Sequence, residues 1–309
     1  MNHRTFAPLA AIFFLICAPV RADFKFTQSG QLTGTDVAAS IAKYGYHGPR
    51  TSVATTFMKG SYLRIDLPDG RYGIIDLKER REIEVDPRKQ SYSAISFDDI
   101  RAQNRADEQA EQAMVKNAEP KFTTEVQMAS TGRTRVFLGQ TAREFRIKLV
   151  DKPLAPQKPA EQNRAPLEIE SWVAPSVPGF SEVSNFYARL AAALGSKPAQ
   201  LGTPKGVVEL MVAEEDQQLG QPVWVALVTK GILDLGGARR IPNGLPMLQT
   251  FGMMAGRTSQ PSGFKWGLTV QVTSYSAGSL DESLFRVSSN YVPSRSKPKD
   301  MWILSIGQL

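Results

Sequence analysis

Three kinds of side chain in this sequence could do chemistry: grouped carboxylates, one histidine, and serines that stand before a lysine. The carboxylate groups are Asp98 with Asp99, Glu168 with Glu170, and Glu214 with Glu215 and Asp216. Two carboxylates could serve as the acid and base of a glycosidase. Glu168 and Glu170, however, fall on the polar face of a predicted strand, and the other groups lie in polar runs. We therefore interpret all of them as solvated charges.

Catalysis by histidine would depend on His47, because the other histidine, His3, lies in an N-terminal segment that we expect to be cleaved. His47 stands in a turn-like loop with no nucleophile motif near it. Two Ser-x-x-Lys matches, Ser262–Lys265 and Ser294–Lys297, lack the companion motifs of a penicillin-binding site. The glycines at 236 and 237 lack the ending of a phosphate-binding loop. We predict no catalytic residue, cofactor or metal site, and keep an uncharacterised hydrolase as a remote alternative.

The first 22 residues have the three parts of a secretory signal peptide. A cationic start with Arg4 precedes an apolar stretch from Phe6 to Val20, and Val20 and Ala22 occupy the positions where the peptidase favours small side chains. This stretch of about 15 residues is shorter than the ~20 that a membrane-spanning helix needs. We therefore expect cleavage after Ala22, a periplasmic or secreted protein that begins at Asp23, and no transmembrane span in the mature chain.

The only cysteine, Cys17, also lies in this segment. A lipid-modified Cys17 is the alternative, although Leu15 and Ile16 precede it where lipoproteins have small residues. Ordinary cleavage leaves no thiol, and so no disulfide or thiolate zinc site. Two of the 37 basic residues are also lost, so the net charge falls from +7 to about +5. The charges are interspersed, and we predict no nucleic-acid partner.

Alternation of apolar and polar residues with a period of two predicts many half-buried strands. Leu63 and Ile65 alternate with Arg64 and Asp66, and the same pattern returns near residues 82–86, 145–149, 167–170 and 268–273. Turn sequences as short as Pro68–Gly70 separate these runs, and such turns join antiparallel neighbours. The pattern predicts an α+β, mainly β fold built on an antiparallel sheet.

Helical character interrupts this pattern in two segments. Residues 98–118 have a thin apolar stripe and predict an exposed helix, whereas residues 181–194 present a fuller apolar face and predict a packed helix. Residues 204–217 suit either a helix or a strand. Four prolines between residues 151 and 166 predict an extended insertion. Strand patterns lie on both sides of it, so we predict a single domain over residues 23–309.

The order of several short motifs resembles a family of exported bacterial proteins of unknown function, which are themselves similar to the lipoprotein carriers of the periplasm. The matching segments are Phe57–Asp66, Ile74–Asp76, Asp86–Tyr92, Gly139–Ala142, Trp172–Pro175, Pro178–Phe180, Leu280–Phe285 and Tyr291–Pro293. The resemblance implies a curved antiparallel sheet, open like half a barrel, with helices over its concave face. In the carriers this concavity holds acyl chains. The family supplies no catalytic residue that maps onto this chain.

An apolar cluster provides the candidate lining for such a concavity. Its members are Trp224, Met247, Leu248, Phe251, Met253 and Met254. Methionine and aromatic side chains adapt to an acyl chain, but the same residues also suit an ordinary core. The first hypothesis is thus a non-enzymatic envelope protein that binds a lipid or acyl ligand in a half-barrel. The alternative is a structural or interaction module with a closed core, whose partner is another envelope protein.

Overall fold

The computed structural model describes residues 23–33, 51–115, 122–153, 167–194, 244–254 and 264–294, and strands account for most of these described residues. The strands are β1 (Phe24–Thr33), β2 (Thr51–Lys59), β3 (Tyr62–Asp66), β4 (Tyr72–Asp76), β5 (Arg81–Asp86), β6 (Ser91–Ser96), β7 (Phe122–Phe137), β8 (Gln140–Pro153), β9 (Leu167–Ala174), β10 (Leu245–Met254), β11 (Phe264–Ala277) and β12 (Val292–Pro293). Two α-helices, α2 (Phe97–Val115) and α3 (Phe180–Leu194), and a 3-10 helix, η1 (Glu282–Phe285), complete the described elements.

Several predicted features lie outside these residues. They are the signal peptide, His47, most of the Pro-rich insertion, the segment 204–217, the carboxylates from Glu214 to Asp216, and Trp224.

The described strands form one twelve-stranded sheet in the order β12-β6-β5-β4-β3-β2-β1-β11-β10-β9-β8-β7. Every pair is antiparallel except β12 with β6. The mainly β fold and the antiparallel sheet predicted from the alternation are therefore confirmed. The pairing of β1 with β11 brings the first described strand beside the penultimate one at the middle of the sheet.

Tight turns explain why β2 to β6 follow one another as a meander. Asp76 closes one turn, because its Oδ1 accepts from the backbone N–H groups of Lys78 and Glu79, and Asp86 closes the turn after β5 in the same way. The residues four positions later, Arg80 and Gln90, have positive φ angles of 51° and 48°. A repeated Asx turn that ends in a left-handed residue therefore sets both hairpins.

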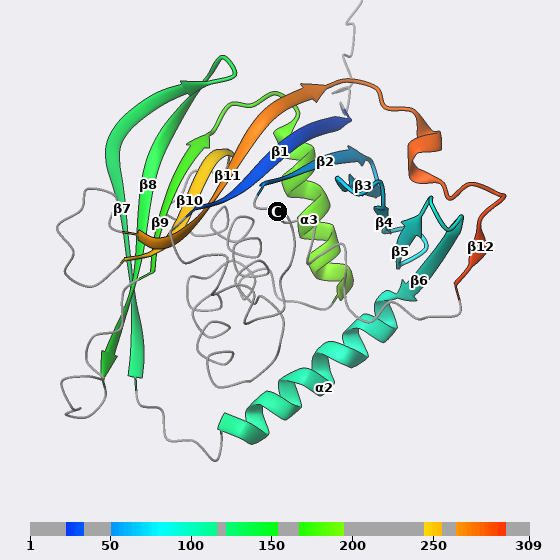
Figure 1. Ribbon diagram of the computed structural model, residues 1–309, viewed down its shortest axis with the longest axis horizontal. Coiled ribbons are helices and arrows are strands. Elements are labelled where there is room, and N and C mark those ends of the chain that lie inside the picture. Colours follow the sequence, from blue (N-terminus) through cyan, green and yellow to red (C-terminus); the bar gives the residue numbers. More distant parts are fainter. Residues whose placement is uncertain are drawn as a thin grey trace, which may run out of the picture.

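The sheet is curved, and Figure 1 shows it arching over α3. Irregular register interrupts its pairing in β1 near Thr27, in β7 after Ser130, and in β10 at Met247 and Met253. An inserted residue bends its strand and increases the local twist. The open, curved antiparallel sheet that the family resemblance implies is thus present.

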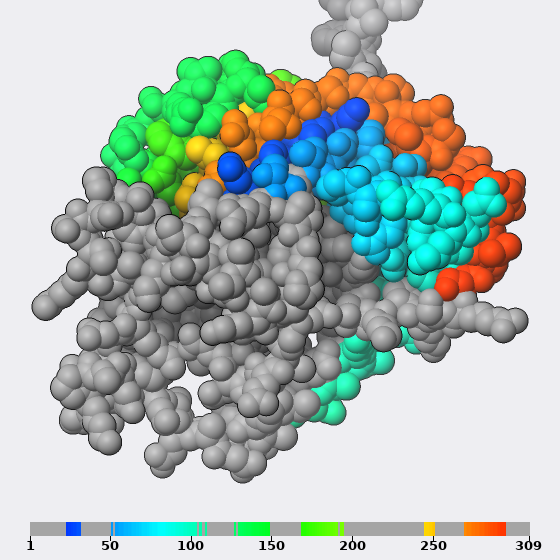
Figure 2. Space-filling view, viewed as in Figure 1, coloured from blue at the N-terminus to red at the C-terminus, as the bar shows by residue number. Residues whose placement is uncertain are grey.

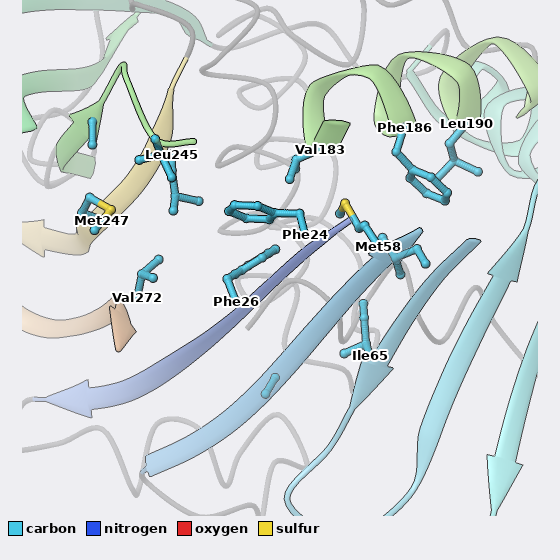
Figure 3. Packing of buried hydrophobic residues seen from close by; sticks show 14 of the residues in the cluster. Phe24, Phe26, Met58, Ile65, Val183, Phe186, Leu190, Leu245, Met247 and Val272 are labelled. Carbon is cyan, nitrogen blue, oxygen red and sulfur yellow. The ribbon is translucent and has the colours of Figure 1, made fainter. Parts of the chain in front are cut away.

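Helix α3 lies under this arch and packs on its concave face. Val183, Phe186 and Leu190 recur at helical spacing, are nearly fully buried, and point toward Phe24 and Met58 of the sheet (Figure 3). The predicted packed helix is confirmed.

Gly179 allows the close approach of α3 to the sheet. It has a φ of +81°, and a Cβ at this position would lie 2.9 Å from Ala277 Cβ and 3.0 Å from Phe24 Cδ2. Only glycine fits here without displacing its neighbours.

Helix α2 is mostly exposed at its described positions, as its thin apolar stripe predicts. Ser96 caps it by accepting a hydrogen bond from the Asp99 N–H, and Phe97 and Ile100 anchor its first turn in the core. The helix extends away from the sheet along the open side of the arch (Figure 1). None of the described helices is long and apolar enough to cross a membrane.

Candidate ligand-binding face

Met247 and Leu248 are the two predicted lining residues whose side chains the structure describes. Met247 is completely buried in the main core cluster beside Leu245, and Leu248 packs against that cluster. Figure 3 shows Leu245 and Met247 beside the aromatic residues of β1. Both described members of the predicted lining therefore contribute to the core.

The structure does not describe the side chains of the other predicted lining residues, so their relation to this cluster is not defined. Phe251, Met253 and Met254 continue β10, and their backbone pairs with β11. Their side chains, and Trp224 as a whole, lie outside the described part of the chain.

A second set of buried residues crosses five strands of the same sheet. The register aligns Phe145 on β8 with Ser171 on β9, Gln249 on β10, Val270 on β11 and Gly30 on β1, and we refer to these five residues as the Gln249 row. All five are buried. Residues aligned across a sheet share a face. The row therefore forms one continuous strip.

This strip continues the concave face of the sheet. Val270 lies two residues from Val272, and Val272 belongs to the core cluster that α3 covers. Residues two apart on a strand point the same way. Next to the strip, Ile147 and Ile169 are aligned with each other and buried. The Gln249 row is thus a polar pair set within an apolar surface.

The polar pair is only partly satisfied. Gln249 Nε2 donates to Ser171 Oγ at 3.1 Å, and both residues are 1% exposed. Gln249 Oε1 is buried and has no hydrogen-bond partner among the described residues. If the amide were turned over, Ser171 would still satisfy only one of its ends. A buried amide oxygen without a donor costs roughly 1–3 kcal/mol. This atom is a site where a bound O–H or N–H group would gain a hydrogen bond.

The sequence carries a signal for this pair that the predicted lining did not include. Ser171 continues the apolar row of Leu167 and Ile169, and Gln249 interrupts the apolar segment 245–254. A polar residue at the dry position of a strand must find a partner when it is buried. Ser171 and Gln249 are 78 residues apart in the sequence and become neighbours only because β9 pairs with β10.

The carboxylates singled out in the sequence are engaged in ion pairs. Lys148 Nζ lies 3.2 Å from Glu168, and Arg146 lies 3.5 Å from Glu170, which also accepts from Trp172 Nε1 at 2.9 Å. These contacts form a charged ladder on the polar face of β8 and β9. The sequence predicted solvated charges here; the structure places both carboxylates in half-buried positions beside these cations.

Asp98 and Asp99 begin α2, and a hydrogen bond from Arg101 lowers the pKa of Asp98. Within the described residues, no three His, Cys, Asp or Glu side chains lie close enough together to hold a metal ion.

One buried carboxylate, Glu144 on β8, was not predicted. Its side chain is fully buried between Arg133, Arg146 and the Thr131 hydroxyl, which donates to it at 2.5 Å. The hydrogen bonds from Arg133 outweigh the effect of burial and lower the pKa of Glu144 to about 2. Glu144 is therefore ionised at neutral pH and acts as a clamp for the β7–β8 hairpin.

Tyr187 on α3 is the other strongly perturbed group. Its ring packs edge-on against Phe186, with ring centroids 5.8 Å apart, and it borders the main core. Burial raises the pKa of its phenol. The phenol therefore stays neutral at physiological pH.

No protein-family model matches the chain, and no curated protein matches it either. The geometry alone defines a class: a mainly β protein with a curved, open antiparallel sheet, packed on its concave side by a helix.

Proposed function

We propose that this chain is a non-enzymatic envelope protein that holds a lipophilic ligand on the concave face of its sheet. The curved sheet and its helix match the architecture that the resemblance to the periplasmic lipoprotein carriers implies. The apolar members of the Gln249 row, together with Ile147 and Ile169 beside it, support the proposal, because packing a hydrocarbon chain against such residues is favourable at roughly 25 cal/mol per Å².

The single observation that carries the proposal is the unsatisfied oxygen of Gln249. A core that serves packing alone gains nothing from a buried amide with a free acceptor. A ligand with an apolar body and one O–H or N–H donor would bury its body on the strip and satisfy this oxygen. The ligand class is therefore an acyl chain that carries a hydroxyl or amide group, and not a plain hydrocarbon.

The second candidate is a structural or interaction module with a closed core, and Met247 favours it. Met247 packs against Leu245 with no exposed surface, as expected of a filled interior. In this alternative the concave face binds nothing, and an outer surface meets another envelope protein.

Ligand extraction separates the two candidates. The exported protein is purified without strong detergent, and native mass spectrometry and lipid extraction reveal any bound acyl compound. We expect one in the wild type and in Gln271→Met, whose side chain is exposed on the same sheet. We expect the yield to fall about tenfold in Gln249→Met, which keeps the bulk and removes the acceptor. A ligand-free wild type that also fails to bind a fatty acid would refute the carrier proposal and favour the closed core.

Export itself is part of the proposal. Strand β1 begins at Phe24, so cleavage after Ala22 would leave every described strand intact. Asp23 would then be the first residue, held through its carboxylate by Lys59 Nζ and the Leu280 N–H, each at 2.8 Å. The mass of the processed N-terminus tests this directly, since a lipid-modified Cys17 would retain six more residues and add acyl mass.

A further inference from the structure

The tip of the β7–β8 hairpin combines two features that reduce stability. Its two-residue turn, Leu138–Gly139, has positive φ angles of 49° and 78°. Turns of this kind favour Asn-Gly or Asp-Gly, because a branched apolar residue is strained in the left-handed region. Leu138 occupies the strained position and is also 47% exposed. An asparagine at this position would avoid both penalties, so folding does not explain the leucine.

A second apolar side chain extends this exposed tip. Val136 is 65% exposed, the highest value among the large apolar side chains of the described residues. It is aligned with Thr141 across the hairpin. The hairpin projects beyond the end of β9, and it forms the upper left corner of the coloured surface (Figures 1 and 2). The two apolar residues therefore stand at a protruding end.

Arginines surround this apolar tip. Arg135 and Arg143 are exposed on the two strands just below the turn, and neither forms an ion pair with a described residue. The guanidinium of Arg135 lies over the Phe137 ring, 4.7 Å from its centroid. Stacking on this buried ring holds one face of the guanidinium and leaves its edge N–H groups accessible.

The base of the hairpin is rigid, which fixes the direction of the tip. Glu144 binds Arg133 and Arg146, and the Arg133 guanidinium lies 5.6 Å from the centroid of the Trp172 ring on β9. Arg146 also lies 3.5 Å from Glu170, so each of the two lower arginines has a carboxylate partner. The upper two, Arg135 and Arg143, have no carboxylate partner within the described ranges.

We propose that this tip docks the protein on an anionic phospholipid bilayer. Leu138 and Val136 enter the interfacial region, while Arg135 and Arg143 bind the headgroup phosphates. A bilayer fits better than a protein, because a stable protein interface buries about 800 Å² on each partner and two side chains cannot supply that area. A small apolar tip with flanking cations is sufficient for weak, reversible membrane binding. The proposal does not depend on a ligand at the Gln249 row.

Vesicle flotation tests the proposal with the exported protein. We expect binding to vesicles of phosphatidylcholine and phosphatidylglycerol at 3:1, and little binding to pure phosphatidylcholine. Leu138→Asn should weaken binding about tenfold. It should not impair folding, because asparagine suits the left-handed turn. Arg135→Gln and Arg143→Gln should each weaken binding about fivefold.

Two control variants match these changes in chemistry at distant positions. Val292→Asn removes another exposed valine on β12, and Arg88→Gln removes an exposed arginine in the turn after β5. Both should bind as the wild type does. Equal binding to neutral vesicles, or unchanged binding by Leu138→Asn, would overturn the proposal. Failure to bind any vesicle would also overturn it.

Discussion

Replacing Glu144 by glutamine should destabilise the protein by about 2 kcal/mol at pH 7. The pKa of Glu144 is lowered from 4.5 to about 2 by its arginine partners, and a change of this size corresponds to about 3 kcal/mol. Those partners, Arg133 and Arg146, are 54% and 55% exposed, so solvent screens part of the interaction. Glutamine keeps the shape of the side chain and still accepts from Thr131, which isolates the effect of the charge.

The pH dependence distinguishes this mechanism from a general packing defect. A lowered pKa means that the contribution of the carboxylate is fully present above about pH 4.5 and is lost as the pH falls toward 2. At pH 3, roughly two fifths of the difference between wild type and variant should remain. Urea unfolding at pH 7, 4.5, 3.5 and 3 measures this, because urea adds no ionic strength.

Glu282→Gln serves as the control, because Glu282 forms an exposed pair with Arg286 at 3.3 Å. Such surface pairs contribute 0 to about 1 kcal/mol, and we expect almost no change in the free energy of unfolding. If the difference between wild type and Glu144→Gln stays constant from pH 7 to pH 3, the ionised carboxylate is not the stabilising group and the argument fails.

Two further predictions concern α3. Gly179→Ala should destabilise the protein more than Gly132→Ala does, because both glycines have positive φ but only at Gly179 would a Cβ meet Ala277 and Phe24. The difference between the two variants in urea unfolding therefore isolates the steric contact. Equal losses of stability would refute the close packing of α3 on β1. Burial raises the pKa of Tyr187, so its phenol should still be protonated at pH 11 in the folded protein. Ultraviolet absorbance at pH 11 should therefore count the same number of phenolates in the wild type and in Tyr187→Phe. One phenolate fewer in the variant would contradict the burial of Tyr187. Since this pKa is raised in the folded state, the contribution of Tyr187 to stability is present below about pH 10 and is lost at higher pH.

Local alternation predicts five of the twelve described strands, which are β3, β5, β8, β9 and β11, and local periodicity predicts both described helices. The alternation around Leu63, the turn at Pro68–Gly70, and the apolar face of α3 each involve residues only a few positions apart. Period and turn chemistry therefore predict them without knowledge of the fold.

The candidate site was predicted less well, because burial is decided by partners far along the chain. Met247 was predicted as a possible lining residue from its type, and the structure places it in the core. Ser171 and Gln249 were not predicted, since neither carries a chemical motif. Only the pairing of β9 with β10 makes them neighbours.

The side-chain inventory is what the sequence determined by itself. It has a single cysteine and two histidines, a strand-rich pattern and short turns, and these follow from composition and local spacing. The alignment of β1 with β11, the Gln249 row and the clamp around Glu144 required the tertiary structure. Which distant strands pair depends on the free energy gained by the whole sheet relative to the chain entropy lost when distant segments are brought together. A local sequence pattern carries no information about that difference.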